Sequence, residues 1–150
     1  MSAHWGPENL PHPPGRYLPA QFIAPHTDGP AYSPLVATLS LASHTVLTLT
    51  PSRGYLETHP DAPPILSILL PPRSLLLLSG TLYADFLHGI AGIALDGREA
   101  LLACANWDDV GERMGDKERK RVEREGMERG RRVSLTCRRV GKVRKGLRIG

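Results

Sequence analysis

The sequence predicts an all-β fold, a sandwich or a barrel, on three observations. Short segments with alternating or β-branched residues recur along the 150-residue chain, and a period of two is the pattern of strands. Turn-forming residues separate these segments, because the chain contains 15 glycines and 14 prolines. Hydrophobic residues make up 41% of the chain but aromatic residues only 5%, so we expect one core built from Leu, Val, Ile and Ala.

The elements follow in order. Residues 1–15 are rich in Pro and Gly without periodicity, which predicts a loose leader before a single domain over 16–150. An apolar stretch at 19–25 leads into a turn at 25–30. The strands predicted after this turn are Leu35–Leu41, His44–Leu49, Ile65–Leu70, Ser74–Leu78, a strand ending at Ile90 within 81–90, and Val133–Val140.

Residues 107–131 break this pattern, because they are densely charged and have few apolar positions. Charges at helical spacing, such as Glu118, Arg121 and Glu125, favour a solvated helix. The same composition is also typical of a disordered segment. Both alternatives stay open, and in either case we expect a surface insertion.

The two cysteines, Cys104 and Cys137, lack metal-type spacing and are expected to be buried thiols in a reducing compartment. The first residues do not have the pattern of a signal peptide. The most apolar stretch, at 65–78, is interrupted by two prolines and an arginine, which argues against a membrane span. We therefore expect an intracellular monomer, in the cytoplasm or the nucleus.

The net charge of +4 is unevenly distributed. Residues 1–110 contain four Lys or Arg against nine Asp or Glu, whereas residues 111–150 contain fifteen against six. A basic end on a mildly acidic body is able to contact a polyanion, so nucleic acid is a candidate partner. The alternative interpretation is an ordinary solvated charged segment.

His26 and Asp28 are separated by one residue, and side chains at i and i+2 of a strand point to the same face. His88 lies 62 residues later, at the end of another predicted strand. Two histidines and a carboxylate form the facial triad of non-haem Fe(II) oxygenases. The alternatives are that residues 26–29 make only a surface turn, and that His44, at the start of a strand, replaces His88.

Alternation at 132–138 places Arg132, Ser134, Thr136 and Arg138 on one face of the last strand. Two arginines on one face are costly to bury unless they are paired, and guanidinium groups bind carboxylates with two hydrogen bonds. A small diacid is therefore a fitting ligand. A solvent-facing polar strand and a phosphate-contacting strand remain alternatives.

These segments together resemble the AlkB family of Fe(II)- and 2-oxoglutarate-dependent dioxygenases, above all the branch of the sixth AlkB homologue. The order and spacing of the matching segments agree with the family from about residue 17 to 140. The segments that carry the resemblance are Tyr17–Pro19, Pro25–Tyr32, Thr38–Val46, Pro72–Leu78, Tyr83–Ile90 and Arg132–Arg138.

The resemblance implies a double-stranded β-helix, or jelly roll, with a shortened N-terminal part that leaves its first strands incomplete. It implies Fe(2+) as the metal, held by His26, Asp28 and His88. The expected reaction uses 2-oxoglutarate and O₂ to hydroxylate or oxidatively demethylate a substrate, with alkylated nucleic acid as the expected substrate.

The resemblance also implies three residues that bind 2-oxoglutarate. Arg132 would pair with its distal carboxylate, Arg138 would lie near its other carboxylate, and Tyr17 would donate a hydrogen bond. The family usually has asparagine two residues before this tyrosine, and Gly15 stands there instead. Two other functions stay open: a catalytically impaired jelly roll that binds nucleic acid through its basic C-terminal region, and an oxygenase that acts on protein.

Overall fold

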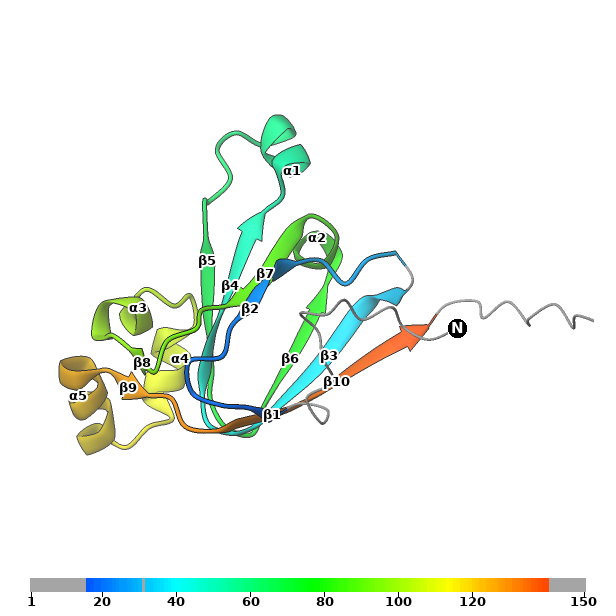
Figure 1. Cartoon of the computed structure of the whole chain (residues 1–150). Helices are drawn as coiled ribbons and strands as arrows, with labels where there is room; N and C mark the ends of the chain where they lie inside the picture. The colour runs from blue at the N-terminus through cyan, green and yellow to red at the C-terminus, as the bar shows by residue number, and fades with distance from the viewer. Residues whose placement is uncertain (1–15, 31, 141–150) are drawn as a thin grey trace, which may run out of the picture.

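The computed structural model describes residues 16–30 and 32–140. At residues 16, 17 and 140 it describes the backbone but not the side chain. The predicted leader at 1–15 and the basic residues after 140 lie outside the described residues. The described chain is mostly β-structure, as predicted, and forms two four-stranded antiparallel sheets with a few short helices (Figure 1).

The strand order of each sheet mixes segments that are distant in sequence. The first sheet has the order β1 (Arg16–Tyr17), β10 (Arg132–Val140), β3 (Tyr32–Ala42) and β6 (Ser74–Ser79). The second sheet has the order β2 (Ile23–His26), β7 (Phe86–Ile90), β4 (Thr45–Pro51) and β5 (Leu66–Leu70). A short ribbon of β8 (Leu95–Asp96) and β9 (Met127–Glu128) lies apart from them, beside the helices.

Five helices complete the described chain: α1 (Arg53–Thr58), α2 (Gly80–Ala84), α3 (Arg98–Leu102), α4 (Trp107–Glu112) and α5 (Asp116–Glu125). The strand predicted within 81–90 occupies only 86–90, because α2 takes the first part of that range. Gly80, with φ +59°, ends β6 and starts this turn of helix, which places Tyr83 in the core. None of the helices described here is long and apolar enough to cross a bilayer.

In the second sheet, strand β4 is covered on both faces. Leu47 and Leu49 of β4 point into the core between the two sheets, while Val46 points to the opposite side. That opposite side is covered by the helices α3 to α5, which contribute Leu101, Trp107, Val110 and Val122 to a second apolar cluster. A strand covered on both faces needs apolar residues on both, which explains why Val46, Leu47 and Leu49 of β4 and Leu69 and Leu70 of β5 are buried.

The segment 107–131 is helical over α4 and α5, which agrees with one of the two sequence-based alternatives, and it includes β9 after them. Arg121 of α5 forms ion pairs with Glu118 and Glu125, as the helical spacing predicts. The segment also contributes to the core, because Trp107 and Val122 are buried. In the ten-residue helix α5, Val122 is the single apolar residue, and it is fully buried in the second apolar cluster.

The first sheet has an unusual distribution of polarity. Its inner face carries the buried Ser40, Arg132 and Ser134 beside Val36 and Leu78 of the core. Its outer face carries leucines that are half exposed or more, namely Leu35, Leu75, Leu77 and Leu135, with exposed fractions of 49–61%. The expectation that Cys137 is buried is wrong, because it lies on this outer face and is exposed, whereas Cys104 is buried as predicted.

Asn106 connects the helices to the edge of the second sheet. Its side-chain oxygen accepts a hydrogen bond from the Leu69 N–H at 2.9 Å, and its side-chain nitrogen donates to the Leu69 carbonyl at 2.8 Å. The side-chain amide thus takes the place of a neighbouring strand beside β5, an edge strand whose backbone groups need partners.

We predict that Asn106→Ala lowers the free energy of unfolding by about 1–3 kcal/mol, because it leaves two backbone groups of Leu69 without their partner. Urea unfolding followed by circular dichroism measures this loss. Glu112→Ala, at the exposed end of the next helix, is the control and should change the free energy by less than about 0.5 kcal/mol. Equal unfolding midpoints for the two variants would contradict this role of Asn106.

Candidate metal centre

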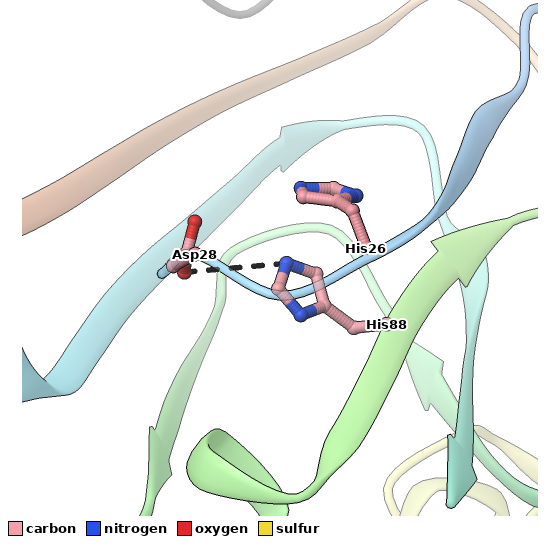
Figure 2. A group of neighbouring side chains, drawn as sticks. All are labelled: His26, Asp28 and His88. Carbon is pink, nitrogen blue, oxygen red and sulfur yellow. Dashed lines mark ion pairs between the residues drawn. The ribbon is translucent and has the colours of Figure 1, made fainter. Parts of the chain in front are cut away.

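His26 and His88 face each other across two paired strands. His26 is the last residue of β2, and the register of the antiparallel pair places it opposite His88 of β7. Their imidazole rings lie 4.3 Å apart between centroids, with a tilt of 53° (Figure 2). The strand pairing therefore brings together two potential ligands that are 62 residues apart in sequence.

Asp28 joins the two histidines from a turn, and here the structure corrects the sequence-based argument. We expected His26 and Asp28 to share one strand face, but β2 ends at His26. The turn is set by Gly29, which has φ +79° and whose carbonyl accepts a hydrogen bond from the Tyr83 hydroxyl at 3.0 Å. The turn, and not the strand alternation, brings the carboxylate to the histidines (Figure 2).

The two oxygens of Asp28 have different partners. Oδ1 accepts a hydrogen bond from Nε of Arg138 at 2.8 Å and forms an ion pair with its Nη2 at 2.7 Å. Oδ2 lies 4.0 Å from Nε2 of His88 and, among the described residues, has no hydrogen-bond partner although it is buried. A buried carboxylate oxygen without a partner is unfavourable, so this oxygen is a fitting ligand for a cation.

One ligand atom from each of His26, Asp28 and His88 lies within 4.8 Å of the other two. Nδ1 of His26 is 2.8 Å from the Ala24 carbonyl, and a carbonyl only accepts, so Nδ1 carries the proton. Nε2 of His26 is then the unprotonated nitrogen that a metal requires. Two imidazoles and one carboxylate suit Fe(II), and the donor set and its spacing therefore fit this metal.

Burial, above all, lowers the pKa of His88, and the nearby His26 and Arg138 lower it further, while Asp28 acts in the opposite direction. A histidine with a lowered pKa is neutral at neutral pH. Its nitrogen lone pair is then available to a metal ion.

Arg132 and Arg138 lie on the inner side of β10, at the two ends of its polar face. Arg132 is buried and donates to the hydroxyls of Ser134 and Ser40, each at 3.1 Å. Arg138 lies at the metal end, where it contacts Asp28. Six residues of strand separate the two arginines by roughly 20 Å, and their long side chains shorten the gap between the charged groups.

Two other sequence-predicted residues have different positions. The backbone of Tyr17 pairs with Arg132 in the first sheet, while its side chain lies outside the described residues. His44, the alternative to His88, is not part of the trio and contacts Asp96 instead, at 3.0 Å.

Gly89 is the site residue that the sequence reasoning missed. A side chain at Gly89 would place its Cβ 3.0 Å from the Ile23 carbonyl and 3.2 Å from the Pro25 nitrogen, both of which are backbone atoms of the neighbouring strand region. Only glycine lets β2 approach β7 so closely beside His88. The available signal was a glycine next to His88 inside the strand predicted to end at Ile90.

Comparisons with known proteins bear on the family to which the chain belongs. No protein-family model matches the chain. Over 133 residues the chain is 36% identical to a protein of Danio rerio described as probable RNA/DNA demethylase ALKBH6. The match covers 85% of the chain but 51% of that relative, so the chain spans about half the length of the protein it resembles.

We predict that Gly89→Ala weakens metal binding by about tenfold or more, because the added Cβ pushes β2 away and separates His26 from His88. Titration with Co(II), followed by its absorption spectrum, measures the affinity. Gly54→Ala is the matched control, since a Cβ at Gly54 meets nothing within 4 Å. If both variants bind Co(II) like the wild type, the close approach at Gly89 is not needed for metal binding.

Proposed function

By homology the chain belongs to the AlkB-like family of Fe(II)- and 2-oxoglutarate-dependent dioxygenases, and on this premise we propose that it is itself such an enzyme. One observation carries the proposal: His26, Asp28 and His88 lie together with a buried, unpartnered oxygen of Asp28 between them. A metal-binding trio beside a strand with a buried arginine is the arrangement that this chemistry requires.

When bound, Fe(II) supplies the oxidation, in which 2-oxoglutarate is converted with O₂ to succinate and CO₂ while a substrate C–H bond is hydroxylated. The residues of the chain would bind the metal and 2-oxoglutarate and orient them. His26, Asp28 and His88 would hold the metal, and Arg138 would keep the Asp28 carboxylate oriented through Oδ1 so that Oδ2 remains available.

Arg132 would bind the distal carboxylate of 2-oxoglutarate. Its guanidinium group is buried on the polar inner face of β10, where Ser134 and Ser40 hold it. Between the two arginines, the hydroxyls of Thr38 and Thr136 lie 3.3 Å apart and offer further polar contacts. A carboxylate bound to Arg132 would replace water in a site of low dielectric constant, which strengthens the ion pair. Tyr17 would add a hydrogen bond.

We further propose that the two four-stranded sheets form the two sides of a jelly roll. The antiparallel orders β1-β10-β3-β6 and β2-β7-β4-β5 alternate early and late strands of the chain, as the winding of a jelly roll requires. The metal trio then lies between the sheets. The second sheet provides His26 and His88, and the first sheet provides Arg138, which contacts Asp28.

Alkylated nucleic acid is the proposed substrate. The similar Danio rerio protein is described as a probable RNA/DNA demethylase. In this chain the basic residues concentrate at 111–150, where they are suited to phosphate contacts. Hydroxylation of an N-methyl group gives a product that loses formaldehyde, and a base in a duplex has to leave the stack to reach the site. With such a substrate, the enzyme would act in the cytoplasm or the nucleus.

The test is turnover of 2-oxoglutarate, measured as succinate formed with added Fe(II), in the presence of a methylated oligonucleotide. We expect His26→Ala to abolish Fe(II)-dependent turnover because one of the three ligands is lost. The control is His59→Ala, an exposed histidine outside the trio, and it should retain wild-type turnover.

Three results would contradict the proposal. Equal turnover in wild type and His26→Ala would show that His26 is not a ligand of the catalytic metal. Oligonucleotide binding without turnover would favour a non-catalytic nucleic-acid-binding module. Turnover with methylated protein but not with oligonucleotides would show that the substrate is a protein.

A further inference from the structure

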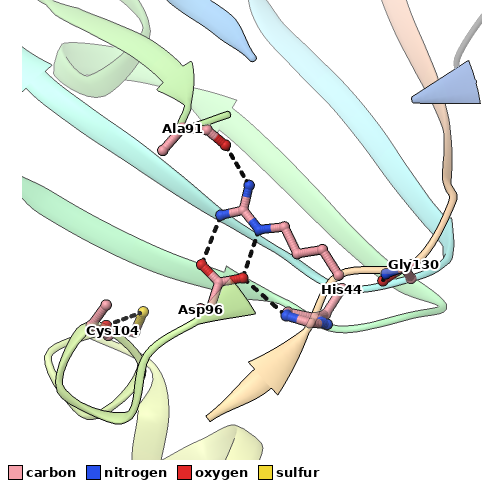
Figure 3. A network of polar contacts seen from close by, with 8 residues as sticks. His44, Ala91, Asp96, Cys104 and Gly130 are labelled. Carbon is pink, nitrogen blue, oxygen red and sulfur yellow. Dashed lines mark hydrogen bonds and ion pairs between the residues drawn. The ribbon is translucent and has the colours of Figure 1, made fainter. Parts of the chain in front are cut away.

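A second buried polar cluster lies outside the metal centre. Asp96, His44 and Arg129 have exposed fractions of 1%, 4% and 8%. Arg129 binds both oxygens of Asp96, from Nε to Oδ2 and from Nη2 to Oδ1, each at 2.7 Å. Nε2 of His44 lies 3.0 Å from the same Oδ2, and Nη1 of Arg129 donates to the Ala91 carbonyl (Figure 3).

Asp96 is ionised in this cluster. Burial acts to raise its pKa, but the hydrogen bonds and charge of Arg129 and His44 outweigh burial and hold the pKa below its usual value. A buried ion pair of this kind is weak evidence for stability, because apolar residues of the same size often stabilise a fold as well. A contribution to stability therefore does not account for this ion pair, and the question is what the three residues hold in place.

The cluster holds the chain directly before Arg132. The Arg129 N–H donates to the Ala94 carbonyl at 2.7 Å, and the Gly130 N–H donates to the Ser43 hydroxyl at 2.8 Å. The Ser43 N–H in turn donates to the Arg131 carbonyl at 3.3 Å. Three successive residues are thus fixed before β10 begins at Arg132.

The same cluster and Arg132 also face one small cavity. His44, Arg129 and Arg132 are all part of its lining. A shift of Arg129 would therefore change the cavity wall that Arg132 also helps to form. Arg129 and Arg132 are close enough for this effect to be local.

We propose that Asp96, with Arg129 and His44, is a positioning device for Arg132 and so sets the affinity of the site for 2-oxoglutarate. This inference rests on the proposed function. Asp96 fixes Arg129, Arg129 fixes the entry into β10, and the entry fixes where the guanidinium group of Arg132 lies. The metal trio is on β2, β7 and the turn after β2, and Arg138, which contacts Asp28, lies at the opposite end of β10 from Arg132. We therefore expect this device to act on Arg132 much more than on the metal trio.

The experiment separates binding of the metal from binding of 2-oxoglutarate. Calorimetry with Mn(II) gives the metal affinity, and calorimetry with 2-oxoglutarate on the Mn(II)-loaded protein gives the co-substrate affinity. We expect Asp96→Asn to weaken 2-oxoglutarate binding about tenfold while the Mn(II) affinity stays within about twofold. Arg132→Gln is the reference for complete loss of the distal carboxylate contact.

Glu118→Gln, which removes an exposed ion pair with Arg121, is the matched control and should change neither affinity. If Asp96→Asn does not fold, Arg129→Lys replaces it, because lysine keeps the charge but cannot bind both carboxylate oxygens. Hydrogen exchange of the amides at 129–134 should become faster in either variant. Unchanged exchange would show that the cluster does not hold this segment.

The outcomes are distinguishable. If the Mn(II)-loaded wild type does not bind 2-oxoglutarate, the proposed function fails, and this inference fails with it. If the wild type binds it and Asp96→Asn binds it equally well, only the positioning role is overturned. If Asp96→Asn loses both affinities by the same factor, the cluster supports the whole fold and has no specific role toward Arg132.

Discussion

The antiparallel pairing of β2 with β7 is the constraint on which the candidate site depends. It places His26 opposite His88, and it exists at this short distance only because Gly89 has no side chain. A shift of one residue in this register would turn one histidine to the opposite face of the sheet. Tyr83 and Arg138 then add the third ligand, by fixing the turn at Gly29 and one oxygen of Asp28.

The polarity of the first sheet supports the same view of the molecule. Its inner face buries Val36 and Leu78 at one part and Arg132 and Ser134 at another, while Leu75 and Leu77 are exposed on the outer face. The buried guanidinium group of Arg132 donates to the hydroxyls of Ser134 and Ser40. The proposed 2-oxoglutarate site would use this polar part of the inner face.

Period predicted most of the strands, and the spacing of His26 and Asp28 singled out this pair, because both features are local in sequence. His88 is 62 residues from His26, and the choice of His88 over His44 came from the family resemblance. Period and spacing did not predict the helices α1 and α3, whose five or six residues are too few for a periodic signal. They also missed the contacts of Asp96 with Arg129 and of Asp28 with Arg138. Such contacts join residues 33 and 110 positions apart and depend on tertiary packing.

The central claim is that Asp28 helps to hold an iron ion that also binds 2-oxoglutarate. The most direct measurement is the visible absorption of the protein with Fe(II) and 2-oxoglutarate under anaerobic conditions. The account predicts that the charge-transfer band of the joint complex appears in the wild type and is absent from Asp28→Ala. A wild type without the band, or a band of equal intensity in Asp28→Ala, would contradict it.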